Sequence, residues 1–542
     1  MRNVGVMACL FPALLAGASC SNGGDSAADL LSDVRNGDSD RGDLTRHDLV
    51  SDARTEAGPG DAGADAAGDA GAEAGASDGR SSLDWTEPLP GEAILAGAAK
   101  IDITPTFEPY TDLDGNGHWD EGEPFEDLDA DGQLDTLELG GFGWRHPTKV
   151  HDPLWSRSAA FRVHGEWLVL CAVDSLGLGI ARVEGIKDKV LARLGNPASL
   201  PRERLVIAST HSHAVPDSIG IFGEAGVDKT YLSWLEVQAA ESIVQAILAV
   251  EPAELTVTSV DVPDLVRDID EPDIIDPYVG IIQARKPGEG KAIATLVSIA
   301  NHPETTWKDN TEISADFPFY LLADIETAEG GTAVYFSADL GLMQSPVKLG
   351  SEGFERAELI GKGYAEAVLS ALGPAAPVPS EQLVPSFGFA KIPAALENPE
   401  LYIGLADGVV DGYQGYIYLT GEPPCDFFGC LDLPVAVWRL GDILTLVTLP
   451  GEFTPELIIG GITTPPDYQG MYPDAPPEPV MIDHLVTPDR FVIGLAGMEC
   501  GYVYPKMTHD PKAHFSQSHA PGPNMAMALM TGIAALLDQV NE

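Results

Sequence analysis

The residues Leu-Val-Ile-Ala-Ser-Thr-His-Ser-His-Ala, at positions 205–214, decide how the rest of the chain is interpreted. Their apolar start predicts a buried strand over 205–208, and two imidazoles follow where that strand passes into a loop. Because side chains alternate along an extended chain, His211 and His213 are expected on the same side. One of them is then placed to bind a metal ion while the other handles a proton. The alternative is a pair of surface or helix-capping histidines.

Three further apolar runs, 294–300, 443–449 and 491–496, also predict strands that lead into ligand-capable side chains. These side chains are His302, Glu452 and Tyr502. Sites commonly form beyond the carboxyl ends of strands in α/β sheets. A set of His211, His302, Glu452 and Tyr502 suits zinc, which accepts nitrogen and oxygen donors and keeps a position for water in catalytic sites.

The amino-terminal segment predicts export. Residues 1–20 hold one arginine and an apolar run, 4–15, that is too short to cross a bilayer, as in a secretory signal. The ending Ala-Gly-Ala-Ser-Cys20 resembles a bacterial lipoprotein signal, which would attach the chain to a membrane surface through acylated Cys20. The alternative is an ordinary signal-peptidase site. Either way, the protein is expected in the bacterial cell envelope or secreted.

Composition then divides the remaining chain into two parts. Residues 21–90 are mostly Asp, Ala, Gly and Ser, so they cannot bury enough apolar surface to offset chain entropy and predict a disordered acidic tether. Residues 91–542 carry strand and helix patterns throughout and are expected to form one folded domain.

The formal net charge of the chain is −52. Nucleic acid is therefore excluded as an expected partner, because phosphate binding needs a basic surface. Acidity on this scale favours solubility and cation binding. It identifies neither a substrate nor a protein partner.

The cysteines of the main domain argue against a thiolate metal site. Cys425 and Cys430 are close enough in sequence to form a small disulfide in an exported protein. Cys171 lies in an apolar strand pattern and is expected in the core. No second close pair exists, so a zinc site made of cysteines is not expected.

The segment 112–138 contains two twelve-residue patterns typical of calcium loops, fifteen residues apart. Each has oxygen-bearing side chains at the ligand positions and a glycine at the sixth, where a sharp turn is needed. The ligands are predicted to be Asp112, Asp114, Asn116, Asp120 and Glu123 in the first loop, and Asp127, Asp129, Asp131, Asp135 and Glu138 in the second. The short repeat leaves no room for flanking helices, so we expect an inserted segment with structural calcium rather than a regulatory pair. The alternative is an acidic, turn-rich loop without an ion.

Periodicity predicts a mixed α/β fold with helices packed outside mixed sheets. Helical spacing covers 183–194, 232–250, 357–372 and 525–540. Further strands are expected at 159–163, 167–173, 255–260, 279–283 and 332–336. The runs 279–283 and 294–300, joined by Lys-Pro-Gly-Glu-Gly, predict a hairpin.

Ordered motifs across 92–542 resemble the amino-terminal catalytic domain of the neutral ceramidase family. They are Ala-Lys-Ile-Asp-Ile-Thr-Pro at 99–105, Asp152-Pro-Leu, Ser-Thr-His-Ser-His at 209–213, Asn-His302-Pro, Ser-Ala-Asp316-Phe-Pro, Pro-Gly-Glu452 and Gly-Tyr502-Val. The resemblance implies that fold, with a calcium-loop insertion, and a zinc-dependent amidohydrolase activity.

The resemblance also implies roles for single residues. Zinc would be held by His211, His302, Glu452 and Tyr502, and His213 would carry a proton beside the attacking water. Tyr502 either ligates the ion or donates a hydrogen bond to the oxyanion. Arg267 resembles the substrate-facing arginine of the family, or else is a structural arginine in an acidic loop.

Two departures from the family pattern concern the substrate. The substrate-contacting serine aligns either with Ser345, which we prefer, or with Gly341. A stretch with His509 and His514 replaces the residues that usually follow Gly-Tyr-Val; these histidines either line a different pocket or, by preference, are exposed in a loop. The chain also has no expected room for the carboxy-terminal immunoglobulin-like domain of typical relatives.

These features give three functional hypotheses. The first is an exported zinc amidohydrolase that cleaves the N-acyl amide bond of ceramide-like lipids and so takes part in sphingolipid metabolism. The second keeps the fold and the zinc but acts on another amide or an ester. The third is a non-catalytic, calcium-stabilised surface lipoprotein.

Overall fold

The computed structural model describes residues 94–542 apart from 129, 131, 224–225, 270–272, 348, 350–352, 423, 426–427, 462–469 and 511–515. These residues lie in the compact unit Ser81–Glu542. The predicted signal with Cys20 and the tether 21–90 lie outside the described residues, as do Asp129, Asp131 and His514. The predicted domain boundaries therefore stay predictions.

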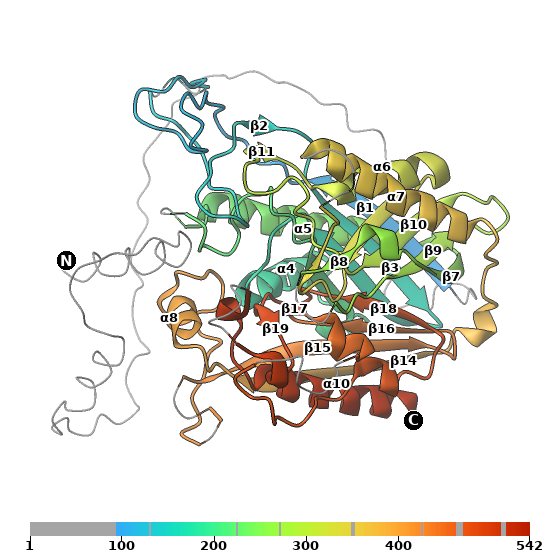
Figure 1. Ribbon diagram of the computed structural model, residues 1–542. Helices are drawn as coiled ribbons and strands as arrows, with labels where there is room; N and C mark the ends of the chain where they lie inside the picture. Colours follow the sequence, from blue (N-terminus) through green and yellow to red (C-terminus); the bar gives the residue numbers. More distant parts are fainter. Residues whose placement is uncertain are drawn as a thin grey trace, which may run out of the picture. The chain divides into compact units, whose positions relative to one another are not determined.

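Three mixed sheets form the framework of this unit (Figure 1). The first has the order β5 (Leu205–Ser209), β4 (Glu166–Val173), β3 (Trp155–Val163), β1 (Ile94–Asp102) and β6 (Glu251–Pro252). The second has the order β12 (Thr332–Ser337), β10 (Ala292–Ile299), β9 (Tyr278–Arg285) and β7 (Glu254–Asp261). The third has the order β14 (Pro385–Ala395), β15 (Cys430–Leu440), β16 (Leu444–Thr448) and β18 (Asp489–Ile493).

Each large sheet is covered by helices on one face. Helix α5 (Lys229–Leu248) packs on β1, β3 and β4, with α4 (Ile180–Arg193) beside it. Helices α6 (Phe317–Glu329) and α7 (Phe354–Leu372) pack together over the second sheet, and α10 (Met525–Asn541) packs on β14 and β15. The shorter helices are α8 (Pro399–Asp407) and α9 (Pro455–Ile459). The expected α/β class, with mixed sheets and helices outside, is confirmed.

The opposite faces of the three sheets meet in one shared core. Leu168 and Leu170 of β4 face this core together with Phe336 of β12 and Phe491 of β18, whereas Val169 and Cys171 face the α4 and α5 side. Both faces of these strands are therefore buried, which is why their sequences are continuous apolar runs rather than alternating ones.

The strand directions bring several carboxyl ends to one place. β4 and β5 are parallel, as are β10 with β12 and β16 with β18. At these ends, an isolated bridge joins Ala208 of β5 to Ala496, and the amide of Gly494, just after β18, donates to O of Ser337, the last residue of β12, at 2.7 Å. The loops that follow β5, β10, β16 and β18 are consequently neighbours.

The predicted elements correspond closely to observed ones, and the 279–300 hairpin is confirmed as antiparallel β9 and β10. The long antiparallel pair of β14 and β15 and helix α6 lack a clear sequence signal. Pro385, Gly388 and Pro393 argue against a strand, but β14 lies at a sheet edge, where proline is tolerated, and α10 packs directly over Gly388. Helix α6 begins Phe-Pro-Phe-Tyr-Leu-Leu, without a polar face in its first turns.

The cysteines behave as expected. Cys425 and Cys430 form a disulfide, and Cys171 is buried with a free thiol. Among the described helices, none combines the length and apolar character needed to span a bilayer.

Asp152 anchors the loop that leads into α6. Its carboxylate accepts hydrogen bonds from Ser314 Oγ at 2.5 Å and from the amide of Ala315 at 2.9 Å. Burial raises the pKa of Asp152 to about 7, although these hydrogen bonds act in the opposite direction. The folded state therefore retains a proton that the unfolded chain, with an ordinary pKa of 3.8, has already lost.

Because of this retained proton, we expect the free energy of unfolding to fall as pH rises from about 4 to about 7. The fall is up to about 4 kcal/mol, at about 1.36 kcal/mol per pKa unit. Asp152→Asn should remove this part of the slope, measured by urea unfolding across that range. The exposed control Asp261→Asn should keep it. Equal slopes for wild type and Asp152→Asn would contradict the assignment.

Candidate functional site

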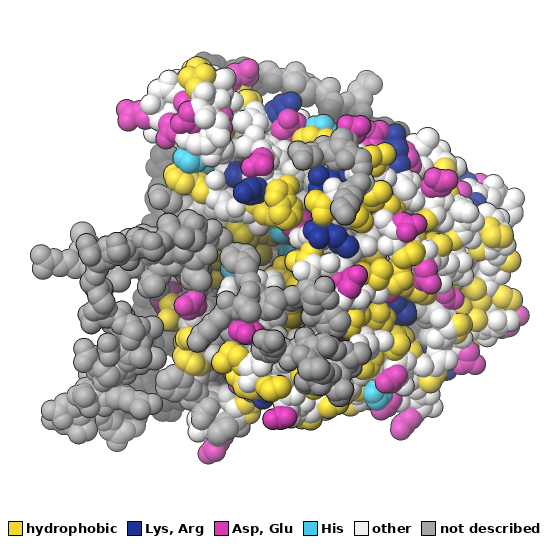
Figure 2. All heavy atoms as spheres, in the orientation of Figure 1, with side chains coloured by type: hydrophobic (Ala, Val, Ile, Leu, Met, Phe, Trp, Pro, Cys, Tyr) yellow, Lys and Arg dark blue, Asp and Glu magenta, His cyan; other side chains and the backbone are white. Residues whose placement is uncertain are grey.

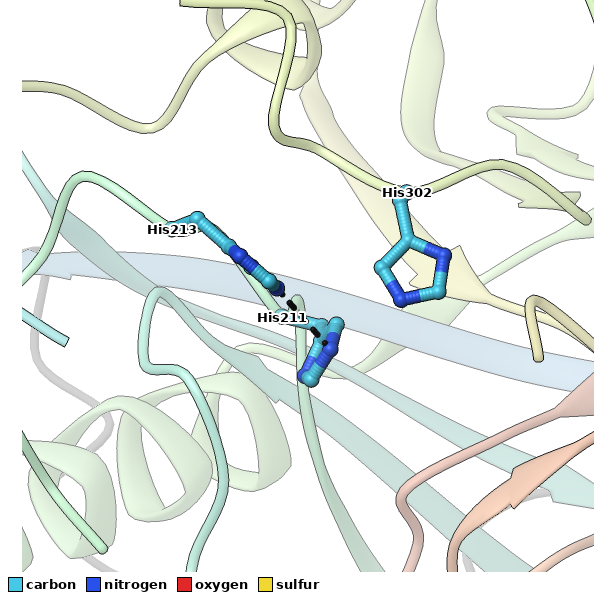
Figure 3. A group of neighbouring side chains, drawn as sticks. All are labelled: His211, His213 and His302. Carbon is cyan, nitrogen blue, oxygen red and sulfur yellow. Dashed lines mark hydrogen bonds between the residues drawn. The ribbon is translucent and has the colours of Figure 1, made fainter. Parts of the chain in front are cut away.

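Three histidines meet where the sheet ends converge (Figure 3). His211 and His213 lie in the loop after β5, and His302 lies in the loop after β10. The Nε2 atoms of His211 and His213 are 3.2 Å apart, so both rings occupy one side of the loop as predicted. His211 is only 3 % exposed and His213 is 9 % exposed. The alternative of surface histidines is therefore wrong.

Backbone carbonyls fix the orientation of two of these rings. Nδ1 of His211 donates to Leu176 O at 2.6 Å, and Nδ1 of His302 donates to Met343 O at 2.9 Å. A carbonyl oxygen only accepts, so the proton sits on Nδ1 and the Nε2 lone pair is free for a ligand. His211 also adopts a left-handed backbone conformation with φ of 68°. Such strain persists where the surroundings hold a residue in place, often at functional sites.

Glu452 brings a carboxylate to the same point from the third sheet. It begins β17 (Glu452–Phe453), which pairs in parallel with β19 (Tyr502–Val503) so that Glu452 and Tyr502 are in register. Glu452 Oε2 lies 3.0 Å from His302 Nε2 and 3.4 Å from His211 Nε2.

The electrostatics of this group reflect its burial. Burial raises the pKa of Glu452, but the adjacent His211 and His302 lower it by more, so the carboxyl stays ionised. Burial lowers the pKa of His302, whereas its hydrogen bond to Glu452 and the charges of Glu304 and Glu452 raise it to about 9. A divalent cation between these atoms would replace the shared proton.

His213 differs from the other two histidines. Its Nδ1 lies 3.4 Å from Glu304 Oε2, at an angle too poor for a hydrogen bond. The ring packs on Phe142, with centroids 4.9 Å apart, and on Gly141, where an added Cβ would lie 2.6 Å from the His213 ring. Burial and repulsion by His211 and His302 keep its pKa well below 6.5. A neutral imidazole can accept a proton.

Tyr502 lies beside the same carboxylate. Burial and the charge of Glu452 raise the pKa of its phenol well above 10, so it is a neutral donor without a metal ion. Its ring centroid is 6.5 Å from that of His302. This position is compatible with both roles considered for Tyr502, a ligand or an oxyanion donor.

A pocket of about 570 Å³ is connected to the histidines through Glu304. Glu304, which contacts His213, also lines this pocket, together with Arg267, Ser345, Trp307 and Phe354. The face shown in Figure 2 has basic and hydrophobic side chains side by side around a hollow in which histidine side chains are visible.

Arg267 and Ser345 are brought together by a short two-stranded sheet of β8 (Arg267–Asp268) and β13 (Met343–Gln344). Arg267 donates to Gln344 Oε1 at 2.7 Å and to Ser345 O at 3.3 Å. Both contacts join β8 to β13, and the substrate-facing role of Arg267 stays a prediction beside the structural one.

The structure distinguishes Ser345 from Gly341 by position. Ser345 lines the pocket and its hydroxyl donates to Asn301 Oδ1 at 3.2 Å, next to His302. Gly341 packs against the backbone of Glu452 and Phe453, where an added Cβ would lie 2.7 Å from Glu452 O. A serine side chain at 341 would need a backbone shift, whereas Ser345 is already at the pocket wall.

Two acidic residues reach the site without a clear signal in the sequence. Glu304 follows His302 by two residues and faces His213. Glu499 lies three residues before Tyr502, with its carboxylate near His211 and Glu452. Burial raises the pKa of Glu304 to about 7, and burial with the charge of Glu452 raises that of Glu499 well above 4.5. The only sequence signal for Glu304 and Glu499 was the presence of an acidic residue close to a predicted ligand.

These groups fit a metal ion. The ligand atoms of His211, His213 and His302 lie within 4.8 Å of one another, as do those of His211, Glu452 and Glu499. Nitrogen and carboxylate oxygen donors, with histidine tautomers set by backbone carbonyls, are typical of zinc sites. The site can therefore hold a metal ion, and its donor set is compatible with zinc.

The first acidic loop gathers a second group of oxygens. The carboxylates of Asp112, Asp114 and Glu123 lie within 4.8 Å of one another. The glycine at the sixth position, Gly117, has φ of 87°, the left-handed turn that the calcium pattern requires. Asn116 and Asp120 lie in the same loop, joined by a side-chain hydrogen bond of 2.5 Å.

In the second loop, a different glutamate makes the contacts expected at position twelve. Glu123 accepts from the amides of Leu113 and Asp120 in the first loop. The equivalent amides in the second, of Leu128 and Asp135, donate to Glu108 at 2.5 and 2.9 Å. The carboxylate of Glu138 instead lies against Gly223.

The Glu108 contacts have a signal in the sequence, because residues 108, 123 and 138 are separated by the fifteen-residue repeat. Asp127 accepts from the amide of Gly132 within the second loop. The assignment of Asp127, Asp135 and Glu138 to calcium stays a prediction.

His509 is not an exposed loop histidine. It is 6 % exposed, its ring lies 6.3 Å from that of Tyr472, and burial lowers its pKa. The preference for exposure is therefore wrong for this residue, which packs inside its loop.

The sequence matches no protein-family model and no curated protein. Its fold, however, is similar to two solved structures. A neutral ceramidase from Pseudomonas aeruginosa aligns with a TM-score of 0.57 and 17 % identity, over 83 % of this chain and 74 % of that one. A ceramidase complexed with C2 aligns with a TM-score of 0.59 and 16 % identity, over 83 % and 76 %. The neutral ceramidase fold expected from the motifs is thus confirmed.

If the site binds zinc, the ion should stabilise the folded chain. At a free zinc concentration of 100 times Kd, the free energy of unfolding should rise by about 2.7 kcal/mol. His302→Ala should lose most of this increase, whereas His484→Ala, in an ion pair with Asp538 outside the site, should retain it. Thermal unfolding with and without zinc measures the effect, and an equal shift in His302→Ala would contradict the ligand assignment.

Proposed function

We propose that the protein is a zinc-dependent amidohydrolase that cleaves the N-acyl amide bond of ceramide-like lipids. The observation that carries this proposal is the convergence of His211, His302 and Glu452, with neutral His213 beside them, at a pocket within the neutral ceramidase fold. The neighbours of known structure are ceramidases, which supports a hydrolase function for a chain with a similar fold.

The proposed zinc ligands are His211, His302, Glu452 and Tyr502. When bound, zinc supplies a Lewis acid and lowers the pKa of water towards 7. The chain's own contribution is preorganisation, because Leu176 O and Met343 O hold both histidines before the ion arrives.

His213 is proposed as the proton carrier. Amide hydrolysis adds the oxygen of water to the acyl carbon and breaks the C–N bond, and the departing nitrogen needs a proton because an amine anion is a poor leaving group. A neutral His213 can accept the proton that water loses and then donate it to that nitrogen. Glu304, 3.4 Å away, would stabilise the protonated ring.

The pocket beside His213 is the proposed substrate site. Arg267 and Ser345 offer polar contacts at its wall, and Trp307 and Phe354 offer apolar surface for an acyl or sphingoid chain. Tyr502 remains a candidate for ligation or for a hydrogen bond to the developing oxyanion.

A second candidate function keeps the site and changes the substrate. The pocket wall also carries Glu304, Asp309, Gln344 and Arg356, and this polarity favours a more polar amide or an ester. The non-catalytic lipoprotein is the third possibility and would leave the buried histidines without a chemical role.

Cellular placement is a further proposal. A signal at residues 1–20 with acylated Cys20 would hold the enzyme at a membrane surface in the bacterial envelope, close to a lipid substrate. The acidic tether would let the hydrolase domain move away from that surface.

The hydrolase proposal predicts release of fatty acid from ceramide by the purified full chain. His211→Ala should abolish release, and His213→Gln should lower kcat by about 10²–10⁴-fold while zinc binding persists. His484→Ala should retain wild-type rates. Cleavage of other amides or esters in place of ceramide would favour the second function, and retained cleavage in His211→Ala would contradict the proposed site.

We also propose structural calcium in the insert 112–138. Calcium should raise the thermal stability of the chain, and Glu123→Gln should weaken its affinity by roughly tenfold or more, because the residue at position twelve is normally a bidentate ligand. The exposed neighbour Glu121→Gln is the matched control. Calorimetry in which Glu123→Gln binds calcium as tightly as wild type would contradict the proposal.

A further inference from the structure

Glu499 places an additional carboxylate at the centre of the site. The residue is 8 % exposed. One of its oxygens, Oε1, accepts from the amide of Gly501 at 2.6 Å. The other, Oε2, is buried and has no hydrogen-bond partner among the described residues. A buried carboxylate oxygen without a partner is costly, which indicates that something absent from the polypeptide satisfies it.

The surrounding packing directs this carboxylate to the site. Gly177 lies so close that an added Cβ there would be 2.8 Å from Glu499 Cγ, and the backbone of Glu499 is held by a hydrogen bond from the Tyr413 hydroxyl. Gly177 directly follows Leu176, whose carbonyl orients His211. The same backbone segment therefore positions the His211 ring and one flank of the Glu499 side chain.

The spacing of the ligand atoms suits a shared ion. Those of His211, Glu452 and Glu499 lie within 4.8 Å of one another. Three donors around one zinc ion, each about 2.0–2.2 Å from it, lie about 3.3–3.8 Å apart. Side-chain movements of up to about 1–1.5 Å would therefore bring all three into contact with the same ion.

We propose that Glu499 Oε2 is a direct ligand of the metal ion held by His211, His302 and Glu452. This inference rests on the proposed function, because it assumes that the site binds a metal ion. The ion would then be held by two imidazoles and two carboxylates, and Tyr502 would be left available as a hydrogen-bond donor.

This donor set changes the expected metal preference. Carboxylates suit harder ions such as Mn²⁺, whereas imidazoles suit zinc. Loss of Glu499 should therefore weaken Mn²⁺ binding by a larger factor than zinc binding.

The test compares the metal affinities of the wild-type full chain with those of the Glu499→Gln variant. Apo protein is titrated with Zn²⁺ and with Mn²⁺ in excess calcium, which keeps the acidic insert saturated. Glu499→Gln should weaken zinc binding by roughly 100-fold, since loss of even an outer-shell partner costs about 10–100-fold. Its Co²⁺-loaded form should also show a changed visible spectrum, because the number of ligands falls.

Glu478→Gln is the matched control. Glu478 is similarly buried, one of its oxygens accepts from the amide of Lys506 at 2.9 Å, and the other has no partner among the described residues. It belongs to none of the ligand groups found in the described part of the chain. Its substitution should leave zinc affinity and the cobalt spectrum unchanged.

The outcomes separate this inference from the proposed function. A wild-type chain that binds no zinc would overturn both. Wild-type binding that persists at full strength in Glu499→Gln would overturn the Glu499 assignment alone. If Glu499→Gln does not fold, a crystal structure of the zinc-loaded wild type decides the question: Oε2 should lie about 2.0–2.2 Å from the ion, and a distance beyond coordination range would overturn the assignment.

Discussion

The hydrogen bonds from Nδ1 of His211 and His302 to Leu176 O and Met343 O set the geometry of the whole site. Each bond fixes a tautomer, and together they aim two Nε2 lone pairs at Glu452 in a region nearly closed to solvent. The Leu176 carbonyl lies in the loop after β4, and the Met343 carbonyl lies in β13 of the short β8–β13 pair. The positions of the two histidines therefore depend on the sheets behind them. The same packing holds the strained backbone of His211.

This dependence explains how three sheets contribute to one small site. Their buried faces share a core, which fixes the relative positions of β5, β10, β16 and β18. The polar side chains then occupy the loops beyond the carboxyl ends, where they can approach one another without interrupting the sheets. His213 stands apart from this ligand group: it is next to His211, but it faces Glu304, which lines the pocket. Metal binding and proton transfer would thus fall to neighbouring residues on one loop.

Much of this arrangement was predictable from the sequence because buried strands and ligand-bearing loops leave local patterns. The run 205–214 predicts both β5 and the two histidines, and Asn-His302-Pro and Pro-Gly-Glu452 follow recognisable strands. Glu304 and Glu499 leave no such pattern, since each is one acidic residue in an acidic chain and its role depends on residues distant in sequence. Glu108 differs from these two: the fifteen-residue spacing to Glu123 marks it in the sequence, but only the fold shows that it serves the second acidic loop. Helix α6 and strand β14 were hidden by uniform hydrophobicity and by proline and glycine, respectively.

The proposed function requires that His211, His302 and Glu452 hold a catalytic zinc ion. Metal content and fatty-acid release from ceramide, measured together on the purified full chain before and after chelation, test it most directly. The account predicts one zinc ion per chain and hydrolysis that is lost on chelation and restored by zinc. A chain without zinc, or hydrolysis that continues after the metal has been removed, would contradict it.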